Sequence, residues 1–164
     1  MSGVLLVEGA SDKVAIEALA RRRGRDLAAE GVEVVAIGGA QAVGRVLAGL
    51  DGRRVAGLCD AGEEALFRRG FGSNVFVCDP DLEGELIRAL GAEAVEEVLG
   101  ANGDLSSFRT MQKQPVWRGR PVEDQLRRFL GSGARRKVRY AALLVDALEL
   151  ERMPVPLDGV LAAV

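Results

Sequence analysis

Near its start the chain reads Val4-Leu5-Leu6-Val7-Glu8-Gly9-Ala10-Ser11-Asp12, four aliphatic residues followed by two carboxylates and a glycine between them. A short aliphatic run that ends at a turn is typical of a buried strand. Ligands of open α/β sheets bind beyond the carboxyl ends of such strands, so Glu8 stands at the expected edge for a site. The stretch predicts a first strand and a candidate functional carboxylate directly after it.

Two later aliphatic runs end in the same way. Residues 55–59 are followed by Asp60-Ala61-Gly62-Glu63-Glu64, and residues 75–78 by Asp79-Pro80-Asp81-Leu82-Glu83-Gly84-Glu85. Because the carboxyl ends of parallel strands meet at one edge of a sheet, these acids predict a metal site there. The alternative is structural: Asp12 and Asp81 can cap helices, and Glu83 and Glu85 suit a first helical turn.

Composition narrows the chemistry. The chain has no histidine, which excludes an imidazole base or ligand, and carboxylate oxygens favour Mg²⁺ or Mn²⁺ over zinc. No Gly-x-x-x-x-Gly-Lys-Ser/Thr or Gly-x-Gly-x-x-Gly motif supports an NTPase or a dinucleotide-binding protein. Cys59 and Cys78 are interpreted as buried apolar residues. Without a membrane-spanning run or signal peptide, we expect a cytoplasmic protein with no membrane partner.

Charge is unevenly distributed. Residues 1–104 have a net charge of −7 and residues 105–164 of +5. An acidic metal-binding half beside a basic half would suit a phosphodiester substrate, although a solvated, arginine-rich surface gives the same pattern. Lys137, at the start of a predicted helix after a glycine-rich turn, is a candidate phosphate ligand or simply a solvated helix end.

The order of elements predicts an α/β fold, with a mainly parallel sheet flanked by helices and a helical extension at the C-terminus. One core and an appendage are expected at 164 residues: a metal-binding domain over 1–104 and a basic helical extension over 105–164 packed on it. Ser11 or Asp12 is expected to cap the first helix. The predicted strands are 4–7, 32–37, 55–59 and 75–78, and the predicted helices are 12–23, 40–50, 63–69, 82–90, 105–113, 122–130, 138–150 and 157–164.

These motifs together resemble the toprim fold of topoisomerases and primases, and more closely the toprim nuclease of the overcoming-lysogenization-defect (OLD) family. The resemblance rests on an ordered set of motifs. They are Val7-Glu8-Gly9-Ala10-Ser11-Asp12, Ile37-Gly38-Gly39, Leu58-Cys59-Asp60, Asp81-Leu82-Glu83, Arg136-Lys137-Val138-Arg139-Tyr140-Ala141 and Met153-Pro154-Val155-Pro156-Leu157.

The resemblance implies a toprim, Rossmann-like domain that holds one or two Mg²⁺ or Mn²⁺ ions and hydrolyses DNA as an endonuclease or nickase. Glu8, Asp60 and Lys137 are then the catalytic candidates. Two ions can activate a water and stabilise the leaving oxygen without any histidine. Tyr140, the sole tyrosine, falls on the core face of a helix, which argues against a topoisomerase. The implied metal ligands are Glu8, Asp12, Asp60, Glu64, Asp81 and Glu83.

Two departures from the OLD pattern matter. Gly62 replaces the second aspartate of Asp-x-Asp, so Glu63 or Glu64 would have to supply that acid. The ATPase half that precedes this domain in OLD proteins is also absent from the sequence. The expected partners are DNA, bound between Arg118 and Arg139, a separate ATPase and a second copy of the chain. The alternative function is a weakly active or non-catalytic nucleic-acid-binding and regulatory module.

Overall fold

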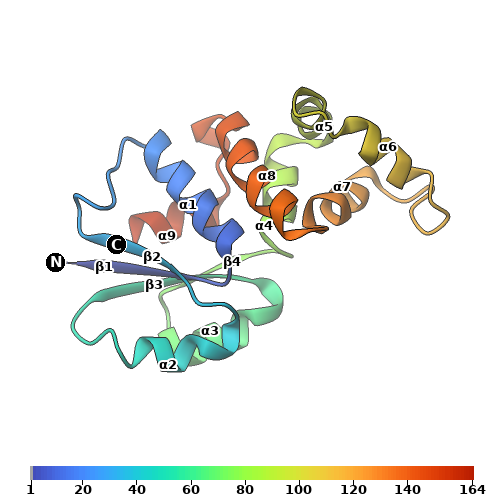
Figure 1. Ribbon diagram of the computed structural model, residues 1–164. Coiled ribbons are helices and arrows are strands. Elements are labelled where there is room, and N and C mark those ends of the chain that lie inside the picture. Colours follow the sequence, from blue (N-terminus) through green and yellow to red (C-terminus); the bar gives the residue numbers. More distant parts are fainter. Residues whose placement is uncertain (1) are drawn as a thin grey trace.

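A single parallel sheet organises the chain in the computed structural model, which describes residues 2–164 (Figure 1). The strands are β1 (Gly3–Val7), β2 (Val32–Ala36), β3 (Arg54–Asp60) and β4 (Val75–Cys78), in the order β2-β1-β3-β4. Strand β1 is central, pairing with β2 and β3, and its residues are buried throughout. The predicted α/β fold with a parallel sheet is confirmed.

Helices cover both faces of the sheet, with α1 and α9 on one face and α2 and α3 on the other (Figure 1). The remaining helices, α4 to α8, extend to one side of the sheet. The helices are α1 (Ala10–Arg22), α2 (Val43–Leu47), α3 (Glu64–Phe71), α4 (Leu82–Leu90), α5 (Ala92–Ala101), α6 (Leu105–Gln112), α7 (Val122–Gly131), α8 (Ala134–Ala147) and α9 (Val155–Ala162).

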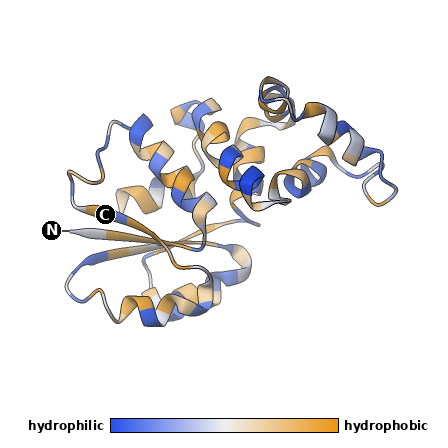
Figure 2. Ribbon diagram, in the orientation of Figure 1, coloured by the Kyte–Doolittle hydropathy of each residue, from blue (hydrophilic) through white to orange (hydrophobic). Residues whose placement is uncertain are grey.

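The larger hydrophobic core joins the sheet to the C-terminal helices. It runs from Leu5 on β1 through Leu86 on α4 to Leu126 on α7 and Leu144 on α8. A smaller cluster around Phe67 fills the other face, where the Phe67 and Phe71 rings stack 5.6 Å apart. In Figure 2 the helices carry both hydrophobic and hydrophilic segments, as expected of helices that bury one side only. Residues 105–164 therefore contribute to the same core as the sheet, while a domain division at residue 104 stays a prediction.

Arginines at and just after the end of α1 bind the C-terminal part of the chain. Arg22 Nη1 donates hydrogen bonds to the carbonyl oxygens of Val145 and Leu148 at the end of α8. Arg25 Nη1 donates to the carbonyl of Leu161 in α9 at 2.5 Å. These bonds satisfy carbonyl groups that a helix end leaves without intrahelical partners. They also fix α8, which packs along α1, relative to the sheet.

Several predicted boundaries were wrong. The helix predicted over 40–50 is a 3₁₀ turn, Ala40–Ala42, followed by the short α2, and the helix that carries Tyr140 begins at Ala134 rather than at 138. Helix α5 was not predicted, because Gly91 separates it from α4 by one residue only. The N-cap of α1 is Gly9; Asp12 lies three residues into the helix and accepts a hydrogen bond from the Gly9 N–H instead. None of the helices within residues 2–164 has the length and hydrophobicity needed to cross a membrane.

Candidate metal and nucleic-acid site

Glu8 joins the ends of the two central strands. It follows β1, and its Oε1 accepts a hydrogen bond from the backbone N–H of Asp60, the last residue of β3, at 2.8 Å. Burial raises the pKa of Glu8, while this bond opposes the rise because it favours the ionised form. The parallel pairing of β1 with β3 thus brings two carboxylates from distant parts of the sequence to one edge of the sheet, as predicted.

Asp60 lies at the electrostatic centre of five acids, here called the acidic cluster: Glu8, Asp12, Asp60, Asp81 and Glu83. Its pKa is raised to about 7, first by burial and then by the negative charges of the four other members. The pKa of Asp12 is raised to about 6, again first by burial, with contributions from Glu8 and Glu83, while the Gly9 N–H opposes the rise. Carboxylates that raise one another's pKa repel each other when ionised, and a bound cation would offset this repulsion.

Asp81 and Glu83 enter the acidic cluster from the start of α4. Asp81 caps this helix, since its Oδ1 accepts the Gly84 N–H at 2.9 Å, so the structural role predicted as the alternative is real. Its other oxygen accepts a hydrogen bond from Arg127 Nε at 2.8 Å. Glu83 is only 7% exposed and lies 3.7 Å from Lys137 Nζ. Each of these two acids therefore already has a cationic partner on the helical side of the molecule.

Glu63 and Glu64 differ in their surroundings. Glu64 Oε1 accepts a hydrogen bond from Arg68 Nε at 2.7 Å along α3. The charge of Glu63, by contrast, raises the pKa of Glu8. Glu64, the acid predicted to replace the missing aspartate at Gly62, is thus already paired with Arg68, whereas the charge of Glu63 acts on Glu8.

The donor set fits a hard divalent cation, because it consists of desolvated carboxylate oxygens. Within residues 2–164, however, no three acidic or thiol side chains converge closely enough to coordinate an ion as they stand. Both predicted buried thiols, Cys59 and Cys78, are buried, and burial raises the pKa of each, which keeps them protonated. The residues that would hold a metal are thus the carboxylates of the acidic cluster.

A groove of about 540 Å³, here called the basic groove, leads away from Asp81 and Glu83. Burial would lower the pKa of Lys137, but the carboxylates beside it, Glu83 first, outweigh burial and the pKa is raised. Lys137 is therefore firmly cationic. The basic side chains that line the basic groove are Arg120, Arg127, Arg128 and Lys137, and Trp117 lines it as well.

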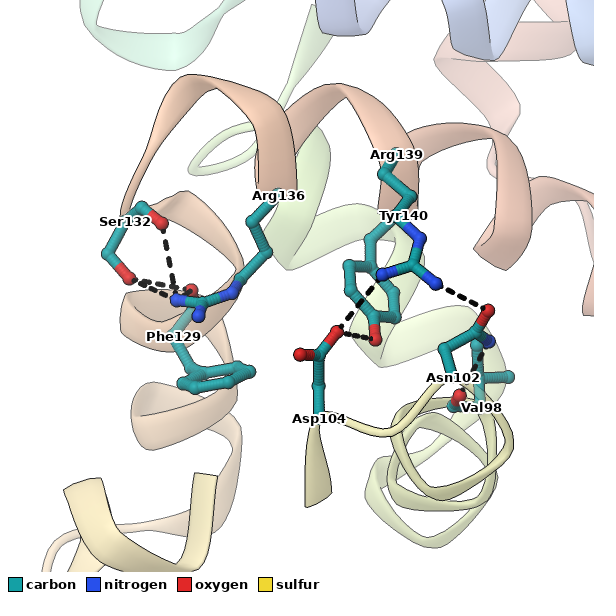
Figure 3. A network of polar contacts seen from close by, with 8 residues as sticks. All are labelled: Val98, Asn102, Asp104, Phe129, Ser132, Arg136, Arg139 and Tyr140. Carbon is teal, nitrogen blue, oxygen red and sulfur yellow. Dashed lines mark hydrogen bonds and ion pairs between the residues drawn. The ribbon is translucent and has the colours of Figure 1, made fainter. Parts of the chain in front are cut away.

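Figure 3 shows what orients the helix that carries Lys137. The Tyr140 hydroxyl donates a hydrogen bond to Asp104, and Arg139 lies 3.5 Å from the same carboxylate. On the neighbouring turn, the Arg136 guanidinium stacks 3.9 Å from the Phe129 ring centroid and donates to Ser132. These contacts tie α8 to α7 and to the turn before α6. The predicted core position of Tyr140 is confirmed at 1% exposure, but no sequence pattern pointed to Asp104 or Phe129 as partners.

Comparison with known proteins gives a consistent picture. Residues 1–57 match the family model "Overcoming lysogenization defect protein-like, TOPRIM domain". The fold is similar to the C-terminal region of the Burkholderia pseudomallei OLD protein, with a TM-score of 0.69 and 16% identity over 98% of this chain and 95% of that one. It is also similar to the C-terminal region of the Xanthomonas campestris pv. campestris OLD protein, with a TM-score of 0.69 and 21% identity over 98% of this chain and 90% of that one. No curated protein matches the chain in sequence.

The resemblance to the toprim domain of OLD proteins is thereby confirmed. Toprim domains in general bind divalent metals and act on nucleic acids.

Proposed function

We propose that this chain, a toprim domain of the OLD type, hydrolyses phosphodiester bonds of DNA with Mg²⁺ or Mn²⁺. The observation that carries the proposal is that the acidic cluster adjoins the basic groove. Asp81 and Glu83 belong to both, and Lys137 of the groove pairs with Glu83. A carboxylate site next to a cationic channel suits a reaction in which a phosphate is held while metal ions act on it.

The acidic cluster and the basic groove would have different roles in this reaction. The acidic cluster would hold the metal, with Glu8 fixed by the Asp60 N–H and Asp12 fixed by the Gly9 N–H. A bound divalent ion would lower the pKa of a water and withdraw charge from the phosphate. Lys137 supplies a positive charge beside Glu83, where it can hold a phosphate oxygen. The flanking phosphates would be held along the basic groove, within the predicted binding segment between Arg118 and Arg139.

Cleavage of supercoiled plasmid tests the proposal. Nicking is expected with Mn²⁺ or Mg²⁺ and not with Ca²⁺, and Glu8→Gln and Lys137→Ala should each abolish it. The matched control is Glu33→Gln, because Glu33 is an exposed acid paired with Arg53 at the opposite end of the sheet. Loss of nicking in the control, or its persistence in Glu8→Gln, would show that the activity does not come from the acidic cluster.

Two observations favour the alternative function, a nucleic-acid-binding module with little activity. Asp81 and Glu83 already pair with Arg127 and Lys137, and Gly62 brings no carboxylate to the third strand end. Calorimetric titration with Mn²⁺ separates the two functions. The module is supported by one weak site together with DNA binding and no nicking, and the nuclease by a metal-dependent loss of plasmid supercoiling.

A further inference from the structure

Trp117, the only tryptophan of the chain, lies on the wall of the basic groove. It belongs to the loop between α6 and α7, which projects at the far right of Figure 1. The same groove reaches the acidic cluster through Asp81 and Glu83. A polynucleotide lying in the groove with a phosphate at the acidic cluster would therefore pass the indole ring.

Hydrogen bonds hold the loop in one conformation. The Trp117 carbonyl accepts a hydrogen bond from Gln125 Nε2 at 2.8 Å, and the Trp117 N–H donates to the Gln114 carbonyl at 2.9 Å. Gln125 is only 5% exposed and its own Oε1 accepts from Gln112 Nε2 at 2.9 Å. A buried glutamine therefore anchors the backbone beneath a half-buried indole, so little ordering is needed when a ligand binds.

The ring is paired with a cation. The Arg120 guanidinium lies 5.4 Å from the centroid of the Trp117 ring, and its Nε donates to the Val116 carbonyl at 2.8 Å. Whereas Arg127 and Lys137 pair with acids, Arg120 and Arg128 form no ion pair within residues 2–164. These two arginines remain available for phosphates. An aromatic ring beside unpaired cations is the combination that single-stranded nucleic acid binds.

We propose that Trp117 and Arg120 form a stacking platform for an unpaired base, so that the substrate is DNA with a single-stranded segment next to the cleaved phosphate. In a continuous duplex the neighbouring base pairs cover each base face, whereas an unpaired base can leave its stack and lie on the indole. The proposal rests on the proposed function, because it specifies the substrate class of the same groove.

Tryptophan fluorescence tests it directly, because Trp117 is the only such fluorophore. The probes are an oligothymidylate of about 12 nucleotides, an abasic chain of the same length and a blunt duplex, titrated in Ca²⁺ without turnover. We expect the oligothymidylate to quench the emission, because its bases stack on the ring. The abasic chain should bind without quenching, and the duplex should quench far less.

Variants add an independent readout, the affinity measured by fluorescence anisotropy. Trp117→Ala should weaken the affinity for the oligothymidylate about 10-fold and leave the affinity for the abasic chain unchanged. Trp117→Phe should restore part of the lost affinity for the oligothymidylate. Val116→Ala is the matched control, since this neighbouring side chain is 65% exposed and lies outside the groove. Thermal unfolding of each variant confirms that the fold is intact.

Three results would overturn the platform: equal quenching by the abasic chain or the duplex, unchanged oligothymidylate binding in Trp117→Ala, or no binding of the oligothymidylate. The proposed nuclease function fails separately. Quenching by the oligothymidylate without plasmid nicking would support the platform and reject the nuclease. Glu8-dependent nicking without quenching would support the nuclease and reject the platform.

Discussion

Replacing Asp60 by asparagine should stabilise the metal-free protein. The pKa of Asp60 is raised from 3.8 to about 7, because burial and the charges of the acidic cluster disfavour its ionised form. About three pKa units correspond to roughly 4 kcal/mol, since each unit is about 1.4 kcal/mol. The side chain is half-buried, so solvent screening reduces this to about 2 kcal/mol. Asparagine removes that cost because it carries no charge at any pH.

The pH dependence has a definite sign. Between pH 4 and pH 7 the folded protein binds more protons at Asp60 than the unfolded chain, so the free energy of unfolding falls as pH rises. Above about pH 8 Asp60 is ionised in both states and the contribution becomes constant. We therefore expect the stability advantage of Asp60→Asn over the native protein to grow from pH 5 to pH 8, reaching about 2 kcal/mol.

Urea unfolding in the presence of a chelator measures this difference. Asp51→Asn serves as the control, because Asp51 is an exposed turn residue before β3 and should leave the stability unchanged. Addition of Mn²⁺ at pH 8 should stabilise the native protein more than Asp60→Asn, since the variant lacks one ligand. The reasoning is refuted if Asp60→Asn is no more stable than the native protein at pH 8, or if both lose stability equally with rising pH.

Three further predictions concern metal affinity and stability. Gly62→Asp should tighten Mn²⁺ binding about 10-fold in calorimetry, because a Cβ there meets no atom within 4 Å and the new carboxylate restores the missing acid; unchanged affinity would place Gly62 outside the site. Tyr140→Phe should lower the free energy of unfolding by about 1–2 kcal/mol through loss of the hydrogen bond to Asp104, and an unchanged urea midpoint would contradict this. Gln125→Ala should cost about 2 kcal/mol, because it leaves Gln112 and the loop carbonyl without their partner, and thermal unfolding that matches the native protein would show the anchor to be dispensable.

The sequence predicted the sheet well because local signals agree there. The aliphatic runs before Glu8 and Asp60 become parallel neighbours, and both residues lie at the expected edge. Boundaries were less accurate where one residue separates two helices, as at Gly91, or where a short helix begins with a 3₁₀ turn, as at Ala40. Such details depend on backbone angles that residue type alone restricts only weakly.

The site was only partly predictable for a different reason. Acids that follow strands carry a recognisable pattern, so Glu8, Asp12 and Asp60 could be selected as candidates from the sequence. No such pattern separates Glu63 from Glu64, because the two acids are adjacent, and the ion pair of Glu64 with Arg68 appears only in the tertiary structure. No sequence pattern indicated Trp117 as a candidate, because its neighbours in the loop carry no periodic pattern.

What the amino-acid sequence determined by itself was the fold class, the carboxylate chemistry of the candidate site and the exclusion of imidazole chemistry, since these follow from hydrophobic periodicity and composition. The tertiary structure alone decided how the parts meet. Lys137 reaches Glu83 because α8 is fixed by Arg22 and by the Tyr140–Asp104 bond, contacts that span from 36 to 126 residues of sequence. Such long-range pairings depend on how the whole core packs, and no local pattern encodes them.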